Sequence, residues 1–293
     1  MAGRLYEEKE SQGAAVLFSK ENRNNHFLME RVAKRMTPFE ILPMMQTAAA
    51  GEDGLLRDGA ALWLKEKRVY DFSKELEDVL RRQAEKEPWK VTTAMVRAMA
   101  PVVCIITHDG KEEAAGLLIW RCREALHFQS FHPDGRAGLS GMLPLGTGIR
   151  PFRECLAEAD DAIRPLLAEW LELFLYTLAG NKEVAERTYC FPGPDGKEAD
   201  IIWLSTGEKT GETIRRDREW LEREEKEGFP IIMGYRKLPH PHIRVSHWHE
   251  YHMGTRRKLL EDRPIAIRWV APVLINREAY ESYKEPGGVK EEP

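Results

Sequence analysis

The strongest constraint on the fold is a run of three β-rich segments with short connections between residues 102 and 131. Their sequences, rich in β-branched and aromatic residues, are VVCIIT (102–107), GLLIWRC (116–122) and ALHFQSF (125–131). The HDGK that follows the first segment is typical of a turn, and strands joined by short turns pair antiparallel. A small antiparallel sheet is therefore expected in this part of the chain.

Helical patterns flank these strands on both sides. Five segments are expected to be helical, namely residues 25–36, 54–70, 71–87, 151–181 and 213–228. Ser73 is a candidate N-cap, Pro165 is expected to break or restart its helix, and Gly180 and Asn181 to end it. Residues 90–100 (KVTTAMVRAMA) fit either a further helix or a lead-in to a strand.

A glycine-rich segment, RAGLSGMLPLGTGIRP at residues 136–151, invites comparison with phosphate-binding loops. It lacks the lysine of the G-x-x-x-x-G-K-[ST] motif, and its glycines do not lead from one strand directly into a βαβ unit. We therefore interpret it as a structural connection.

Further strands are expected beyond a turn at residues 191–200 (FPGPDGKEAD). They are IIWLS (201–205), PIIMGYR (230–236) and IAIRWVAPVLIN (265–276), the last interrupted by Pro272. The pattern predicts an α+β fold, with a helix-rich N-terminal half that carries the small antiparallel sheet, followed by a smaller mixed α/β C-terminal module. The expected divisions are a flexible arm (1–24), a helical α+β domain (25–190), the C-terminal module (195–283) and a disordered tail (284–293).

Composition excludes a strong whole-protein field for nucleic acid or membrane. Hydrophobic residues make up 42% and charged residues 31%, as in globular proteins with a proper core, and the net charge is only −4. The start MAGRLYEEKE has no apolar signal core, and no apolar stretch approaches the length of about eighteen residues that a membrane helix needs. We expect a cytoplasmic protein without a membrane partner.

The four cysteines support the same compartment. Cys104, Cys122, Cys155 and Cys190 lie far apart, and no C-x-x-C occurs. Three of them have apolar or aromatic neighbours, so the pattern predicts buried free thiols in a reducing environment.

The stretch HPHIRVSHWHEYHMGTRRK (240–258) holds five of the chain's nine histidines. Side chains alternate along a strand, so His240 shares a face with His242, and His247 shares one with His249. H-x-H is a real ligand spacing, which leaves a zinc-stabilised interaction module as one hypothesis. The stretch has no cysteine and no H-E-x-x-H, and we predict no metal and no cofactor.

Cations and aromatic residues are interleaved in the same region, which is a typical composition for RNA contact. Arginines and lysine can bind phosphate, and aromatic rings can stack on bases. The candidate residues for binding RNA or a partner are Arg244, His247, Trp248, His249, Tyr251, Arg256, Arg257, Lys258, Arg268 and Trp269.

The histidines also fit acid–base chemistry without a metal. Cleavage of RNA at the 2′-hydroxyl needs a base and an acid with pKa values near neutrality, and cations for the phosphorane. His247 and His249 are the candidate catalytic residues, beside Arg244 or Arg268. The competing interpretation is a structural adaptor, a packed strand pair in which Trp248 and Trp269 are cross-strand core residues.

The C-terminal block also resembles a known family. An arginine and HWH-x-Y precede a glycine and a basic turn, and an RW-x-x-P-x-x-x-N strand follows. The matching positions are Arg244, His247, Trp248, His249, Tyr251, Gly254, Arg268, Trp269, Pro272 and Asn276. This block is similar to the tail of the second family of type V-A anti-CRISPR proteins and its homologues on plasmids, prophages and integrative elements. His252 departs from the pattern, in which an aromatic or aliphatic residue follows the tyrosine.

The resemblance implies a specific activity. Members of that family are understood to recognise the N-terminal polypeptide of a CRISPR nuclease as it leaves the ribosome, and to cause loss of the mRNA being translated. By this resemblance the partners would be a nascent polypeptide, from a type V-A nuclease or another target, and mRNA or the ribosome. We infer that the N-terminal half binds peptide and the C-terminal module contacts RNA, ribosome or a recruited nuclease. The alternative is a metal-independent ribonuclease or toxin-like RNA-binding protein.

Overall fold

The structure is a computed structural model. It describes residues 36–52, 54–85, 91–108, 116–146, 149–192, 198–227, 240–255, 257, 263 and 265–284. The expected flexible arm (1–24), the helix at 25–36 except for its last residue, the strand at 230–236 and the tail from 285 lie outside the described residues.

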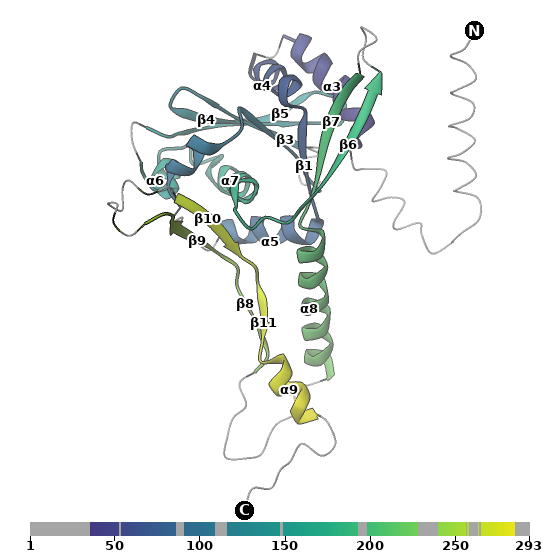
Figure 1. Cartoon of the computed structure of the whole chain (residues 1–293), viewed down its shortest axis with the longest axis vertical. Coiled ribbons are helices and arrows are strands. Elements are labelled where there is room, and N and C mark those ends of the chain that lie inside the picture. The colour runs from purple at the N-terminus through teal and green to yellow at the C-terminus, as the bar shows by residue number, and fades with distance from the viewer. Residues whose placement is uncertain are drawn as a thin grey trace, which may run out of the picture. The chain divides into compact units, whose positions relative to one another are not determined.

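A seven-stranded sheet in the order β5-β4-β3-β2-β1-β7-β6 forms the centre of the fold (Figure 1). β1 pairs in parallel with β2 and with β7, and the other pairs are antiparallel. The strands are β1 (Arg68–Phe72), β2 (Val102–Ile106), β3 (Gly116–Cys122), β4 (Ala125–Phe131), β5 (Ala137–Pro144), β6 (Val184–Pro192) and β7 (Glu198–Thr206). The α+β class is confirmed, and the sheet is larger than expected and mixed.

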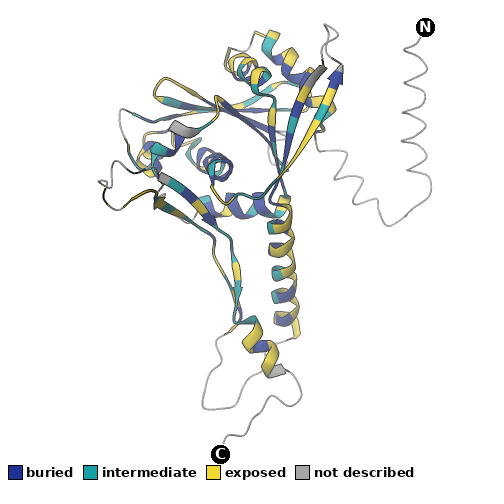
Figure 2. Cartoon of the chain, in the orientation of Figure 1, coloured by how far each residue is buried: buried dark blue, intermediate teal, exposed yellow. Residues whose placement is uncertain are grey.

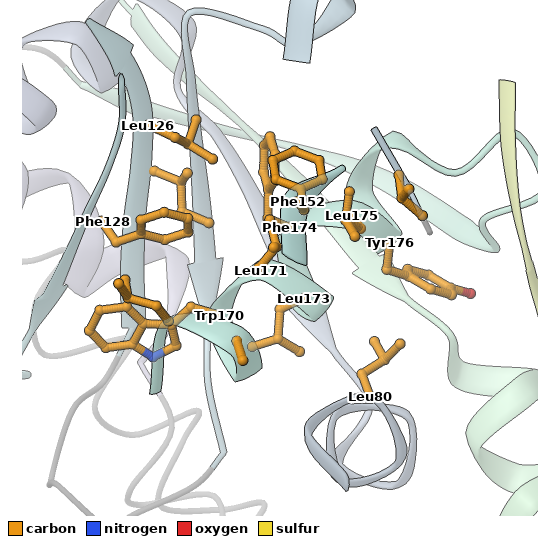
Figure 3. Packing of buried hydrophobic residues seen from close by; sticks show 14 of the residues in the cluster. Leu80, Leu126, Phe128, Phe152, Trp170, Leu171, Leu173, Phe174, Leu175 and Tyr176 are labelled. Atoms are coloured by element: carbon orange, nitrogen blue, oxygen red, sulfur yellow. The ribbon is translucent and has the colours of Figure 1, made fainter. Parts of the chain in front are cut away.

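Helices cover both faces of this sheet. One apolar cluster joins a sheet face to α3 (Pro38–Ala50) and α4 (Gly54–Glu66). The other joins the opposite face to α5 (Lys74–Ala84), α6 (Phe152–Ala157) and α7 (Arg164–Leu178), with a 3-10 helix η1 (Thr93–Ala98). Figure 2 shows the resulting burial along the strands, and Figure 3 shows Leu171 and Phe174 of α7 packed among apolar side chains.

The glycine-rich segment was interpreted wrongly in part, because residues 137–144 form β5 at the edge of the sheet. The glycines allow close packing there. A Cβ on Gly141 would lie 2.6 Å from Leu167 Cδ2 of α7, and a Cβ on Gly138 would clash with the Ser130 hydroxyl. Glycine in a strand often marks such close approaches, and sequence periodicity does not show them.

Several other details differ from expectation. Residues 68–70 and 71–72, expected to end one helix and begin the next, together form β1, since they pair on both sides within the sheet. Ser73 does hold the N-cap position of α5, but its hydroxyl donates to the Gly207 carbonyl and accepts no hydrogen bond from a helix N–H. None of the four cysteines is in a disulfide, yet Cys122 and Cys190 are exposed, so the prediction of buried thiols holds for Cys104 and Cys155 only.

The last elements are α8 (Glu208–Glu227), a long antiparallel ribbon and α9 (Arg277–Lys284). The ribbon has an upper ladder of β9 (His247–His252) with β10 (Ile265–Val270), and a lower ladder of β8 (His242–Arg244) with β11 (Val273–Ile275). Two residues on each strand, Val245–Ser246 and Ala271–Pro272, interrupt the pairing between the ladders, and Pro272 cannot donate a ladder hydrogen bond. The expected break at Pro272 is confirmed.

The expected boundary near residue 195 falls between β6 and β7, which pair with each other along their whole length. β7 also pairs with β1. Residues on both sides of the boundary therefore share one sheet. The division of the chain into two domains near residue 195 stays a prediction.

The N-terminus of α8 is held by Glu183, whose carboxylate accepts hydrogen bonds from the backbone N–H groups of Lys209 (2.8 Å) and Thr210 (2.9 Å). Burial raises the pKa of Glu183, but these bonds and the one from the Thr210 hydroxyl outweigh it and hold the pKa below its ordinary value. The first N–H groups of a helix have no partner within the helix, so this contact fixes where α8 begins.

Glu183→Gln should lower the free energy of unfolding by about 1 kcal/mol at pH 7. Because the folded-state pKa is lowered, the carboxylate's contribution is fully present above the unfolded pKa of about 4.3 and disappears as pH falls through the folded value. Urea unfolding at pH 7 and pH 3 should show the difference from wild type shrinking at the lower pH. Glu212→Gln, on the exposed surface of α8, is the control and should show no such pH-dependent loss.

Candidate functional site

The upper ladder has one face towards the core and one towards solvent. Trp248 pairs with Trp269 on the inward face, and Glu250 pairs with Ile267 on the same face. Ile267 is fully buried and Trp269 is 3% exposed. Because side chains alternate along a strand, His249 and Arg268, which are also paired, lie on the outward face.

A buried polar network holds the inward face. Glu172 of α7 is fully buried, and its carboxyl oxygens accept hydrogen bonds from Gln83 Nε2 (3.0 and 3.1 Å) and from the Trp248 indole (2.7 Å). Gln83 Oε1 accepts from the Trp269 indole (3.1 Å) and from the Ser246 hydroxyl (2.5 Å). Each of these bonds pairs a donor with an acceptor, which buried polar groups require. α5, α7 and the ribbon therefore share one hydrogen-bonded network.

The backbone edge of β10 is fixed as well. The side chain of Asn181 accepts from the Trp269 N–H (3.0 Å) and donates to the Trp269 carbonyl (2.8 Å). Gly180 N donates to the Ile267 carbonyl (2.9 Å). The residues expected only to end α7 thus also bind the ribbon, and they set which residues of β10 face the core.

Two further residues of β9 point inward. Glu250 accepts a hydrogen bond from the Thr92 N–H (3.3 Å), next to η1. His252 is half-buried, and its ring Nδ1 is buried. Neither residue faces the solvent side of the ribbon, so neither adds a carboxylate or an imidazole to the outward histidines.

The outward face carries His247, His249, Tyr251 and Arg268, which we call the outward strip. The rings of His249 and Tyr251 stack with centroids 4.8 Å apart, and those of His247 and His249 lie 6.4 Å apart. The guanidinium carbon of Arg268 lies 5.2 Å from the centroid of the Tyr251 ring. The strip thus combines imidazoles, a phenol and a cation in one continuous row.

The other predicted site residues are distributed differently. Trp248 and Trp269 face the core, so their rings are not available on the surface of the strip. Arg244 is exposed on β8 of the lower ladder, and Arg257 is exposed beyond the end of β9. Arg256 and Lys258 lie outside the described residues.

Sequence reasoning missed Gln83 and Glu172. Both lie on largely apolar helix faces, near residues such as Leu80 and Leu171 of the core. A polar residue on the buried face of a helix is a usable signal, since such a group must find a partner. Only the tertiary structure shows that the partners are two indoles.

The described residues contain no group of three or more His, Cys, Asp or Glu side chains placed to hold a metal ion. Among the described helices, none is long and apolar enough to span a membrane. The outward strip presents imidazole, phenol and guanidinium groups.

A family model matches residues 129–277 of the chain, just over half its length, and describes the AcrVA2-like anti-CRISPR type V subtype A2 family. The chain belongs to this family. The matched range runs from β4 to the first residue of α9 and includes the whole ribbon and its outward strip. No curated protein and no solved structure matches the chain.

The positions that carried the resemblance have separable structural roles. Gly254 and Asn276 have positive φ angles of 96° and 66°, which glycine and asparagine adopt with the least strain. Asn276 Nδ2 also donates to the His240 carbonyl (3.3 Å). Gly254 and Asn276 therefore determine the backbone conformation at the two ends of the ribbon. The side chains of the outward strip, in contrast, face away from the core.

Trp248→Phe keeps an aromatic ring, although a smaller one, and removes the N–H that Glu172 accepts. We expect the free energy of unfolding to fall by about 1–3 kcal/mol, because a buried acceptor loses a partner. His249→Ala, on the outward face of the same strand, should change it by less than about 0.5 kcal/mol. Urea unfolding followed by fluorescence measures both, and equal losses would show that the network does not hold the ribbon.

Proposed function

We propose that this anti-CRISPR family member lowers the level of a target protein by recognising its nascent polypeptide and causing loss of the translated mRNA. In this proposal the outward strip contacts RNA or the ribosome. The target is a type V-A CRISPR nuclease or a protein recognised in a similar way.

The observation that carries the proposal is the division of the ribbon into two faces. The inward face is hydrogen-bonded to α5 and α7 through the two indoles, so the backbone of β9 and β10 is held in place. The outward face then presents Tyr251, which is 38% exposed, beside His249 and Arg268. A held row of rings with a cation suits a single-stranded nucleic acid, because rings stack on bases and guanidinium groups bind phosphate.

The net charge of the protein fits a local contact of this kind. At −4, the whole molecule does not attract RNA over long distances, so binding has to come from a small surface with its own cations. Arg268 belongs to the outward strip, and Arg244 and Arg257 are exposed elsewhere in the same region. Selectivity for one message would then come from the peptide rather than from the RNA sequence.

Reporter genes fused to candidate N-terminal leaders test this proposal in cells that express the protein. With a recognised leader, the reporter mRNA should fall several-fold, and Arg268→Gln should restore most of it by removing a phosphate contact. Arg153→Gln, an exposed arginine of α6, removes the same charge away from the strip and should leave the loss intact. If no leader lowers reporter mRNA, the proposal fails.

A second candidate function is metal-independent RNA cleavage. His247 and His249 lie on one face with ring centroids 6.4 Å apart, and Arg268 pairs with His249 across the ladder. Two imidazoles and a guanidinium could serve as base, acid and phosphate contact.

Purified protein incubated with RNA in the presence of a chelator distinguishes the two functions. Cleavage by the protein itself should follow a bell-shaped pH profile and fall at least about 100-fold in His247→Ala or His249→Ala. RNA that stays intact over a broad pH range, with and without ribosomes, would exclude direct cleavage. Message loss in cells would then require a recruited nuclease.

A further inference from the structure

A cavity of about 150 Å³ lies where α5, α8 and the bend of the ribbon meet. Its apolar lining comes from Val79 of α5, Ile243 of β8, and Val245 and Pro272 at the bend. Gln83 and Ser246, members of the buried network, also line it. The cavity is therefore built partly from the residues that fix the ribbon.

Two arginines line the same cavity, Arg82 of α5 and Arg218 of α8. Arg82 Nε donates to the Asp78 carbonyl (3.0 Å), and neither guanidinium forms an ion pair with a described carboxylate. The preceding residue differs, because Arg81 is paired with Glu77 at 2.8 Å and with Glu169 at 2.7 Å. The cavity thus has two cations without a bound anion from the described part of the chain.

The electrostatic environment of Arg218 also favours a bound anion. Burial, and next the positive charge of Arg82, lower the pKa of Arg218. The carboxylates of Asp78, Glu75 and Glu222 act against this shift, but they do not reverse it. An anion bound between the two guanidinium groups would relieve their repulsion.

Contacts at both ends of α8 hold the walls of the cavity in place. α8 packs against α5 at one end. At the other, Tyr280 of α9 donates to Glu224 of α8 (3.1 Å), and its ring lies edge-on to Trp220 with centroids 5.7 Å apart. Since α9 directly follows β11, these contacts fix α8 relative to the lower ladder. The cavity is then a preformed feature, which lowers the cost of binding.

Size and lining decide between classes of occupant. Cavities that bind drug-sized molecules or cofactors usually measure about 300–1,000 Å³, whereas one of about 150 Å³ holds a group the size of benzene. The cavity therefore suits one side chain. The described residues of its lining include no aromatic one, whereas pockets for nucleobases rely on aromatic stacking. An aliphatic side chain of a polypeptide fits better than a base.

We propose that this cavity binds an aliphatic side chain of the target polypeptide, whose neighbouring acidic residue pairs with Arg82 and Arg218. Val245, 59% exposed at the bend, gives the incoming chain an apolar surface beside the cavity. The planar guanidinium groups bind a carboxylate through paired hydrogen bonds. This inference rests on the proposed function in taking the occupant from the target polypeptide, and it assigns peptide recognition to the junction of α5, α8 and the ribbon.

The full-length protein, labelled at methyl groups for NMR, can be titrated with capped glycine–serine peptides that differ only in a central pair. A Leu-Asp pair should bind about tenfold more tightly than Leu-Asn or Ser-Asp, and it should shift the methyl signals of Val79, Ile243 and Val245. Equal affinity for Leu-Asp and Leu-Asn, or shifts elsewhere in the protein, would overturn the inference. So would an oligouridylate that shifts these methyl signals when Leu-Asp does not, or shifts that depend on protein concentration alone, which would indicate a second copy of the chain.

Variants locate the charge contact. Arg82→Gln and Arg218→Gln should each remove the preference for aspartate, and Arg218→Lys, which keeps the charge but loses the paired geometry, should reduce it. Arg216→Gln is the matched control, because Arg216 is exposed on the same helix and does not line the cavity. An equal effect of Arg216→Gln and Arg218→Gln would contradict a specific site.

The reporter assay separates this inference from the proposed function. If a leader causes mRNA loss and Arg218→Gln leaves that loss intact, the cavity is not the recognition site, while the proposed function stands. If the Leu-Asp preference is found but no leader lowers any mRNA, the cavity binds acidic peptides and the proposed function fails.

Discussion

The structure of the C-terminal region depends on the hydrogen bonds that two tryptophan indoles donate into a buried pair of polar side chains. Glu172 and Gln83 lie beneath the ribbon, and each accepts one indole N–H. Burying these groups without partners would cost several kcal/mol. The stability of α5 and α7 therefore depends on the ribbon, and that of the ribbon depends on these helices. A one-residue shift of β9 would turn Trp248 outward and place His247 or His249 over Glu172.

Two surfaces follow from this arrangement. On the solvent side, the fixed register gives the row of His247, His249, Tyr251 and Arg268. Next to the network, the interruption of both strands at the bend leaves the cavity lined by Arg82 and Arg218. One surface carries rings with a cation and the other an aliphatic cavity with two cations, so they suit different ligands. The proposed function, in which recognition of a peptide leads to loss of its message, would use both kinds.

The sequence predicted local features well and long-range pairing poorly. The strands β3, β4 and β10 and the break at Pro272 are confirmed, because they depend on neighbours in the chain. β1 was missed, because its residues were divided between the helices expected at 54–70 and 71–87, and they form a strand only through pairing with β2 and β7. β5 was interpreted as a connection because it is rich in glycine. Its glycines are explained by close contacts with α7 and β4, which local sequence preference does not show. The two arginines of the cavity come from helices far apart in the sequence and had no signal at all.

By itself, the sequence determined the α+β class, the strand that carries the histidines and the resemblance to an anti-CRISPR family. Only the tertiary structure decided which side of that strand meets the core. HWHEYH alternates whichever face is buried, and its histidines and tryptophan are all compatible with either side. The choice was made by Gln83, Glu172 and Asn181, which lie far from β9 in the sequence and bind the indoles and the edge of β10.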